Sequence, residues 1–412
     1  MLFSKPTKAV GLDIGSHSVK AVQMSKHGGR LRVDNVGFAF VDRTQFNMDP
    51  VVAQASALRE AVRTVPLAGT YVVGALPGQT VVIRYPRLPE MDDAQLANSI
   101  EREAGQNIPY ERSEVFLDWT PLDRVTEGTK TMLKVLLVAA RYEVVETRVQ
   151  IAHEAEISYS ALGVDSLALA DAAEGCDFLR VGETVALINI GQTTTSIHFV
   201  KDGISNFIRD ISWGSRELIQ AIAKARRVEI SDAEKLLFQS ASEEPTAVEP
   251  PPLPEMDDDI PESPPPEESK LGGLDELGGG LLDPLEEELS GLDSAHSPSS
   301  APAAQAVEDK DVGEVLATPL ARLVSEIRRS FDYYEQQLYE HPVDRLIVSG
   351  GVAHLPLLRE TVADELGVSV ELADPTRSAL VLGPEHNVAR MLEQPAQFMV
   401  AVGLAARGMA DL

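Results

Sequence analysis

The stretch VGLDIGSHS at residues 10–18 is echoed by ALINIGQTT at residues 186–194. Each copy consists of an apolar run, a polar residue two positions before glycine, and a hydroxyl-bearing turn that leads into a second apolar run. Two such copies predict two related lobes that face each other, and ligands commonly bind where domains meet. The repeat therefore predicts a ligand between the lobes.

The order of the elements predicts an α/β fold, because strand-like runs alternate with helical ones. Residues 8–14 and 19–24 predict a β-hairpin around residues 15–18, and residues 71–75 and 80–85 predict a second hairpin. Helices are expected at residues 91–107, 144–162, 315–339 and 355–366, and a buried strand is expected at residues 345–348.

Composition favours a protein of the cytoplasm. Cys176 is the single cysteine among 412 residues, so an intramolecular disulfide framework and a cysteine metal cluster are both excluded. Residues 1–10 lack the charge and apolar pattern of a secretory signal. No apolar run approaches the ~20 residues that a membrane-spanning helix needs. We therefore expect no direct membrane insertion, and any membrane association should come through a partner.

Most of the negative charge belongs to one segment. The net charge is −28, and residues 243–311 hold 20 acids and two bases, which gives −18 and leaves −10 for the rest. No basic stripe with interleaved aromatic residues occurs, so nucleic-acid binding is disfavoured. Proline blocks at 250–252 and 264–266 and a glycine run at 278–280 predict a disordered insert over residues 242–312.

The insert admits two interpretations. One is a solvated linker, and the other is an acidic docking segment that folds on a partner. Its leucines recur at near-helical spacing, with acids between them; these are Leu271, Leu274, Leu277, Leu281, Leu282, Leu285 and Leu289.

The two repeated turns have the chemistry of a phosphate site. Gly15 and Gly191 allow backbone N–H groups to approach an anion with no β-carbon in the way. Lys20 offers a compact positive charge, and Asp13 can hold magnesium through water. Hydroxyl donors come from Ser16, Ser18, Thr193, Thr194 and Thr195. A tight hairpin without a ligand is the alternative for either turn taken alone.

A third glycine element, LIVSGGVA at residues 346–353, is a buried strand that runs into Gly350 and Gly351. Adjacent glycines let a flat ligand such as an adenine ring lie against the backbone. A plain strand-to-helix turn is the alternative.

These motifs resemble a known superfamily. GLDIGS at residues 11–16 resembles the first phosphate motif of the actin, Hsp70 and sugar kinase superfamily, NIGQTTT at 189–195 its second, and residues 347–352 its adenosine motif. AGQNIPY at 104–110 and FMVAVGLAARG at 398–408 resemble the PilM family of type IV pilus assembly proteins, relatives of the division protein FtsA. The resemblance implies an actin-like (ribonuclease H-like) fold with duplicated domains around a nucleotide cleft and a small extra subdomain.

The resemblance also implies a domain plan. Domain I would span residues 1–180, including an extra subdomain at about 91–165. Domain II would span residues 181–241 and 313–394 around the insert, and residues 395–412 would return to domain I as a helix.

The resemblance further implies ATP and Mg²⁺ as cofactors. Gly214 and Glu217 would lie near the ribose, and Gly350, Gly351 and Val352 near adenine. His17 either contacts phosphate or is a solvent-exposed turn residue. The residues implied for phosphate and magnesium are Asp13, Gly15, Ser16, His17, Ser18, Lys20, Asn189, Gly191, Gln192, Thr193, Thr194 and Thr195.

Asn189 is a departure from the superfamily pattern, which has aspartate at this position. Asparagine supplies neither a carboxylate charge nor a general base. We therefore expect ATP binding with at most weak hydrolysis, and no catalytic residue is assigned.

The implied function is a cytoplasmic scaffold for type IV pilus assembly and twitching motility, peripheral to the inner membrane through its partners. Its extra subdomain would bind the N-terminal cytoplasmic tail of PilN, and the protein would link PilN to the pilus motor ATPases and the platform protein. An oligomer is compatible with the sequence. The alternatives are an FtsA-like filament protein and a small-molecule kinase of the same superfamily.

Overall fold

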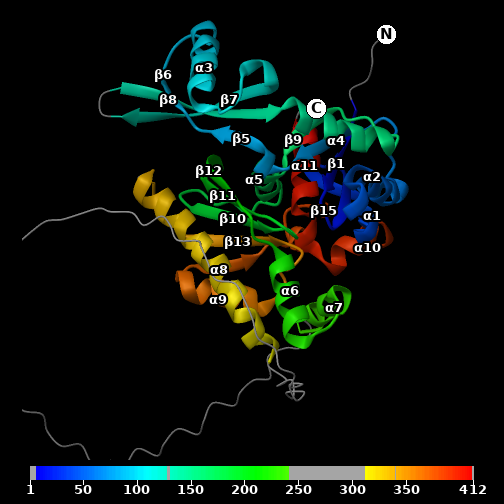
Figure 1. Ribbon diagram of the computed structural model, residues 1–412. Coiled ribbons are helices and arrows are strands. Elements are labelled where there is room, and N and C mark those ends of the chain that lie inside the picture. The colour runs from blue at the N-terminus through cyan, green and yellow to red at the C-terminus, as the bar shows by residue number, and fades with distance from the viewer. Residues whose placement is uncertain (1–5, 128–129, 241–310, 339, 411–412) are drawn as a thin grey trace, which may run out of the picture. The chain divides into compact units, whose positions relative to one another are not determined.

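The computed structural model describes residues 6–127, 130–240, 311–338 and 340–410 (Figure 1). Nearly all of the predicted insert, residues 242–312, lies outside these ranges. Its last position, Val312, begins α8 (Val312–Asp332), and the Asp311 side chain caps this helix by accepting a hydrogen bond from the backbone N–H of Gly313.

The first lobe is built on a six-stranded sheet with the order β15-β3-β2-β1-β4-β9. Its strands are β1 (Lys8–Ile14), β2 (Ser18–His27), β3 (Arg30–Phe40), β4 (Tyr71–Leu76), β9 (Ala161–Val164) and β15 (Val381–Leu382). Its helices are α1 (Arg43–Met48), α2 (Pro50–Ala61), η1 (Val62–Thr64), α4 (Tyr142–Glu154), α5 (Asp165–Gly175), α10 (Glu385–Glu393), η6 (Pro395–Phe398) and α11 (Met399–Ala410).

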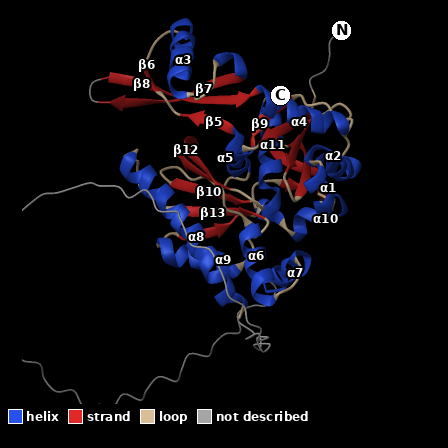
Figure 2. Ribbon diagram, viewed as in Figure 1, coloured by secondary structure: helices blue, strands red, loops and turns tan. Residues whose placement is uncertain are grey.

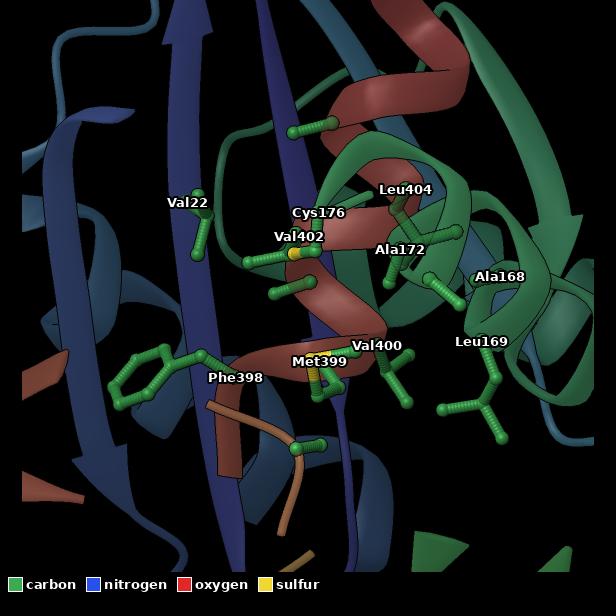
Figure 3. Close-up of a cluster of buried hydrophobic side chains, with 14 of the residues drawn as sticks. Val22, Ala168, Leu169, Ala172, Cys176, Phe398, Met399, Val400, Val402 and Leu404 are labelled. Atoms are coloured by element: carbon green, nitrogen blue, oxygen red, sulfur yellow. The ribbon is translucent and has the colours of Figure 1, made fainter. Parts of the chain in front are cut away.

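Successive residues of β1 point to opposite faces of this sheet, as strand geometry requires. Val10 and Leu12 pack with apolar residues of α2 and α4, whereas Ala9 packs with residues of α5 and α11. Figure 3 shows the second of these cores, where α11 lies against α5 beside β2. Gly11 permits this close approach, because a Cβ on it would lie 2.1 Å from the carbonyl oxygen of Ala401.

The second lobe is built on a five-stranded sheet with the order β12-β11-β10-β13-β14. Its strands are β10 (Thr184–Ile190), β11 (Thr195–Lys201), β12 (Ile204–Ile211), β13 (Arg345–Gly350) and β14 (Ser369–Leu372). Its helices are α6 (Ser215–Arg226), α7 (Ile230–Ser240), α8 (Val312–Asp332), the π-helical turn η4 (Tyr333–Gln337), α9 (Pro356–Leu366) and η5 (Pro375–Arg377).

The two lobes repeat the same strand arrangement. In each, three antiparallel strands follow one another, and the first of them pairs in parallel with a later strand, β4 or β13. The two lobes also share a shift of the strand register. It lies between Gln23 and Met24 on β2 and between Phe199 and Val200 on β11. The predicted α/β actin-like fold with duplicated domains is confirmed.

A third, four-stranded sheet forms the extra subdomain, in which β8 pairs with β5, β6 and β7. Figure 2 shows α3 lying over this sheet, and their shared core includes Leu96, Ile100, Val135 and Leu137. The elements are η2 (Gly78–Thr80), β5 (Val81–Arg84), β6 (Arg87–Pro89), α3 (Asp93–Asn107), η3 (Arg112–Glu114), β7 (Val115–Glu127) and β8 (Lys130–Arg141).

The predicted second hairpin is wrong. β4 has β1 on one side and β9 on the other, so neither of its edges is open to the segment that follows. The chain therefore leaves the first sheet after β4, and β5 pairs with β8 instead.

The predicted helix at residues 144–162 is also wrong in its second half. Helix α4 ends at Glu154, and Glu156 has a positive φ of 61°. Residues 161–164 form β9, which pairs in parallel with β4. The prediction failed here because an apolar run of this length suits a buried strand as well as a helix. The predicted helix at 315–339 begins earlier, at Val312, and its regular part ends at Asp332.

The proposed domain bounds differ from the sheets at two places. The four-stranded sheet starts at Val81 and ends at Arg141, whereas α4 and β9, within the proposed residues 91–165, belong to the first lobe. β15 and α10, within the proposed residues 313–394, contact β3 of the first lobe.

Candidate functional site

The two repeated turns lie against each other. The Ser16 Oγ lies 3.4 Å from the Gln192 Oε1, and the Gln192 Nε2 lies 3.4 Å from the His17 Nδ1. Each turn closes in the same way, because the Gly15 N–H donates to the Ser18 carbonyl at 3.1 Å and the Gly191 N–H donates to the Thr194 carbonyl at 2.9 Å. The fold thus brings together two glycine turns that are far apart in the sequence.

Helices of the first lobe hold the first turn in place. The Gln54 Nε2 on α2 donates to the Gly15 carbonyl at 2.9 Å, and the Arg148 Nη1 on α4 donates to the Ile14 carbonyl at 3.1 Å. Arg148 is buried, which lowers its pKa, while the nearby Tyr159, Asp165 and Asp13 act in the opposite direction. Sequence reasoning missed Gln54 and Arg148, because each sits in an ordinary helical segment with no motif around it.

Asp13 and Lys20 form an ion pair at the end of the first hairpin. They are cross-strand partners on β1 and β2, and the Lys20 Nζ lies 3.1 Å from the Asp13 Oδ2. Their side chains are 17% and 14% exposed, so both groups remain accessible to a ligand. An ammonium and a carboxylate in this position can bind a phosphate and a hydrated magnesium ion, respectively.

His17 contacts the second lobe. Its Nε2 lies 3.2 Å from the Glu234 Oε1 on α7, and the Glu234 Oε2 pairs with the Arg43 Nη2 at 3.2 Å. Burial lowers the His17 pKa more than the Glu234 carboxylate raises it. The interpretation of His17 as a solvent-exposed turn residue is therefore wrong, because its ring is half-buried against a partner in the other lobe.

The start of α6 supports the second turn. The backbone N–H groups of Ser215 and Arg216 donate to the carbonyls of Gly191 and Gln192 at 2.9 and 3.0 Å. Gly214 lies so close that a Cβ on it would approach the backbone of Gln192 to 2.4 Å. The Glu217 carboxylate accepts a hydrogen bond from the Arg322 Nη1 at 3.0 Å.

Two of the predicted phosphate residues are engaged inside the second lobe. The Thr195 hydroxyl is fully buried and donates to the Trp213 carbonyl at 2.8 Å. The Asn189 Oδ1 accepts a hydrogen bond from the Ser349 Oγ at 3.2 Å, which ties the end of β10 to β13. Thr195 and Asn189 therefore shape the turn, and the groups at its tip are left to face the other lobe.

The third glycine element lies beside the strand that carries the second turn. Gly350 has φ of +101°, and a Cβ on it would lie 2.2 Å from the Ile190 carbonyl oxygen. The Gly351 N–H donates to the same carbonyl at 3.3 Å. The Val352 side chain is buried in the core of the second lobe, so it holds the third glycine element against that core.

A pair of part-buried carboxyl groups, those of Asp165 and Asp210, flanks Gly78. The Asp165 Oδ1 accepts hydrogen bonds from the backbone N–H groups of Gly78 and Ser166 at 2.7 and 2.6 Å. The Asp210 Oδ1 is hydrogen-bonded by the Ser196 hydroxyl. Burial, with the Asp210 charge second, raises the pKa of Asp165 to about 7. Sequence reasoning missed this pair, because its members come from different lobes and belong to no motif.

Four apolar side chains are exposed where the extra subdomain meets the first lobe. Phe116 on β7 and Tyr142 on α4 are 55% and 38% exposed, and their rings are in edge contact with centroids 4.5 Å apart. The Arg141 guanidinium lies over the Tyr110 ring at 5.4 Å. Val149 lies two helical turns after Tyr142 on the same face of α4. We call Tyr110, Phe116, Tyr142 and Val149 the apolar patch, and grouped exposed apolar residues are typical of protein interaction sites.

Among the described residues, no helix combines the length and the apolar character that are needed to cross a membrane.

Comparison with known proteins gives a consistent match. A family model described as type IV pilus assembly protein PilM matches residues 11–244 and 303–409. A solved structure described as the PilM-PilN type IV pilus biogenesis complex is 21% identical, with a TM-score of 0.68, over 97% of this chain and 98% of that chain. The ethanolamine utilization protein EutJ from Carboxydothermus hydrogenoformans is 13% identical, with a TM-score of 0.48, over 97% and 90% of the two chains. MreB 5 of Spiroplasma citri bound to AMPPNP is 12% identical, with a TM-score of 0.44, over 97% and 95%.

Proposed function

The chain belongs to the PilM family of type IV pilus assembly proteins, and from this premise we propose that it is an ATP-binding scaffold of the inner-membrane assembly complex. Its two turns would hold the phosphates of one ATP, with Mg²⁺ near Asp13. Its extra subdomain would bind the N-terminal cytoplasmic tail of PilN, and other surfaces would contact the pilus motor ATPases and the platform protein. The protein would thus lie in the cytoplasm, attached to the inner membrane through PilN.

The contact between the two turns is the observation that supports the nucleotide proposal most strongly. Contacts of Ser16 and His17 with Gln192 bring the two turns together, and backbone N–H groups in turns can form anion-binding concavities. Lys20 adds the positive charge that a triphosphate requires. Asn189 provides no carboxylate for activating water, so ATP would act mainly as a clamp that stays bound.

Replacement of Lys20 by methionine is expected to weaken ATP binding roughly 10- to 100-fold, which is the range for loss of a charged hydrogen bond of about 1.5–3 kcal/mol. The variant loses the ammonium and leaves the Asp13 carboxylate unpaired beside the phosphates. Isothermal titration calorimetry with ATP and Mg²⁺ on the purified full chain measures the change. Lys26→Met is the matched control, because Lys26 is exposed on the same strand. Equal affinities in the two variants would show that Lys20 does not contact the phosphates.

The apolar patch supports the proposal for the PilN tail. A peptide that docks there would cover aromatic side chains that otherwise face water, and aromatic residues often dominate the binding energy of interfaces. Tyr110 is also the last residue of the stretch AGQNIPY that resembles the family. The solved complex that this chain resembles contains PilN by its description.

Replacement of both Phe116 and Tyr142 by serine is expected to lower the affinity for a synthetic PilN N-terminal peptide at least about 10-fold, while ATP affinity stays unchanged. Both side chains are exposed, so the fold should tolerate their removal. Fluorescence anisotropy with a labelled peptide gives the affinity. Leu357→Ser removes an exposed apolar side chain from α9 in the second lobe and serves as the control. Peptide binding that survives in the double variant would place the tail elsewhere.

A further inference from the structure

The chain enters and leaves the extra subdomain through the first lobe, yet two polar side chains of the subdomain contact the second lobe. The Tyr85 hydroxyl, between β5 and β6, lies 2.7 Å from the Ser205 Oγ on β12. The Lys134 Nζ on β8 donates a hydrogen bond to the Asn206 Oδ1, also on β12. We call these two contacts the bridge. The subdomain therefore spans both lobes, although the chain enters and leaves it through the first.

A further ion pair reinforces the bridge at its edge. The Arg87 Nη2 on β6 lies 3.3 Å from the Glu340 Oε1, and the Glu340 side chain is only 17% exposed. Glu340 follows α8 in the second lobe. Three separate side chains of the subdomain thus contact the same lobe.

Lys134 is the buried member of the bridge, so breaking its hydrogen bond would be costly. Lys134 is 4% exposed, and burial lowers its pKa to about 8. Burial also raises the pKa of Tyr85. A buried hydroxyl or ammonium that loses its partner without gaining water carries a large penalty. Small displacements of the second lobe should therefore move the subdomain with it, because the contacts would otherwise be left unpaired.

The bridge contacts β12 at its irregular point. Asn206 on β12 has no paired residue on β11, because the register shifts at this point. Asp34 on β3 has no paired residue on β2 at the equivalent point of the first lobe. In the first lobe β15 pairs with β3 beside this point, at Arg32 and Val33. The corresponding place in the second lobe is the one that the subdomain contacts.

Hydrogen bonds connect the bridge to the hairpin of the second turn. The Ser205 Oγ lies 2.7 Å from the His198 Nε2, and the His198 Nδ1 lies 3.0 Å from the Ser166 carbonyl oxygen. His198 is fully buried on β11, the strand that begins at Thr195 directly after the second turn. One strand pair therefore holds the phosphate turn at one end and the subdomain at the other.

The apolar patch contains side chains of both the extra subdomain and the first lobe, so a motion of one relative to the other would change it. Phe116 belongs to the subdomain, whereas Tyr142 and Val149 belong to α4 of the first lobe. Any rotation of the subdomain relative to the first lobe changes the spacing between these side chains. The shape of the patch thus depends on the position of the second lobe.

We propose that the bridge, Tyr85 with Ser205 and Lys134 with Asn206, couples the separation of the two lobes to the shape of the apolar patch, so that bound ATP raises the affinity for the PilN tail. The proposal rests on the proposed function, which supplies both ligands. ATP held by both turns favours one separation of the lobes, and the bridge transmits that preference as a population shift. Coupling is reciprocal, so the peptide raises ATP affinity by the same factor.

The test compares peptide affinity with and without ATP and Mg²⁺ in the full chain. We expect ATP to raise the affinity of the unaltered protein for a labelled PilN N-terminal peptide by roughly 5- to 150-fold, the usual range for coupled sites. In Tyr85→Phe combined with Lys134→Met, the factor should fall at least several-fold towards 1, because both hydrogen bonds of the bridge to β12 are then lost. Tyr71→Phe combined with Lys130→Met makes the same chemical changes on β4 and at the exposed start of β8, and it should keep the factor.

The outcomes separate the two ideas. If the unaltered protein fails to bind ATP or the peptide, the proposed function is wrong and the bridge proposal falls with it. If both bind but the factor is near 1 in the unaltered protein, or is kept in the bridge variant, only the bridge proposal is overturned. A second measurement needs no variant: hydrogen exchange over residues 81–141 of the unaltered protein should slow when ATP is added, and unchanged exchange would contradict the proposal.

Discussion

Replacement of Gly350 by alanine is expected to lower the free energy of unfolding by about 3 kcal/mol, whereas the same change at Gly351 should have little effect. Gly350 has φ of +101°. A new Cβ would lie 2.2 Å from the carbonyl oxygen of Ile190, 2.7 Å from the carbonyl carbon and 2.8 Å from the backbone nitrogen of the same residue. All three are backbone atoms, which cannot turn aside as a flexible side chain does. Gly351 has no atom within 4 Å of the equivalent position. Urea unfolding of the two variants measures the difference.

This pair of variants also tests the site. Ile190 ends β10, directly before Gly191, so a displacement of Ile190 should move the second turn and weaken ATP binding in whatever fraction of Gly350→Ala stays folded. Gly351→Ala should stay folded, so any loss of ATP affinity in this variant would come from the new methyl group facing the ligand. Equal unfolding curves for the two variants would show that the close approach of β13 and β10 is not as tight as the structure has it.

Replacement of Gly403 by alanine is expected to cost about 3 kcal/mol or more of stability, because overpacking of a close helix contact displaces backbone. A Cβ on Gly403 in α11 would lie 1.8 Å from the Ala168 carbonyl oxygen and 3.1 Å from the Ala172 nitrogen, both on α5. Thermal unfolding followed by circular dichroism measures the loss. The two helices would have to separate in the core drawn in Figure 3.

Gly105→Ala is the control for this helix glycine. Gly105 lies in α3, and a Cβ on it would meet no atom within 4 Å. Alanine has the higher helix propensity by up to about 1 kcal/mol, so this variant should be as stable as the unaltered protein or more stable. A loss in Gly105→Ala equal to that in Gly403→Ala would mean that the contact between α11 and α5 does not limit stability.

The sequence predicted the hairpins of the two turns because their information is local. Glycine at each tip, with apolar runs on both sides, fixes a strand, a turn and a returning strand without reference to the rest of the chain. The same reasoning failed after β4, where the apparent hairpin at residues 71–85 depends on which strands already occupy the sheet. Whether a strand has a free edge is decided by β1 and β9, and neither adjoins β5 in the sequence.

The site shows the same division. The glycine turns were predicted from the repeat, and Asp13 and Lys20 were proposed from the chemistry of their side chains beside the first turn. The contacts of Gln54, Arg148 and Glu234 were not predicted, since each comes from a helix that approaches the first turn from elsewhere in the fold. The interpretation of His17 as an exposed turn residue failed for this reason.

By itself, the sequence determined that this protein has two related lobes with glycine turns, because repetition and glycine placement act over short stretches of chain. The tertiary structure alone decided that the turns meet, that two part-buried carboxyl groups lie beside Gly78, and that the subdomain inserted in one lobe contacts the other. These features depend on surfaces that form only when distant elements pack together, and packing between faces leaves no regular spacing in the sequence.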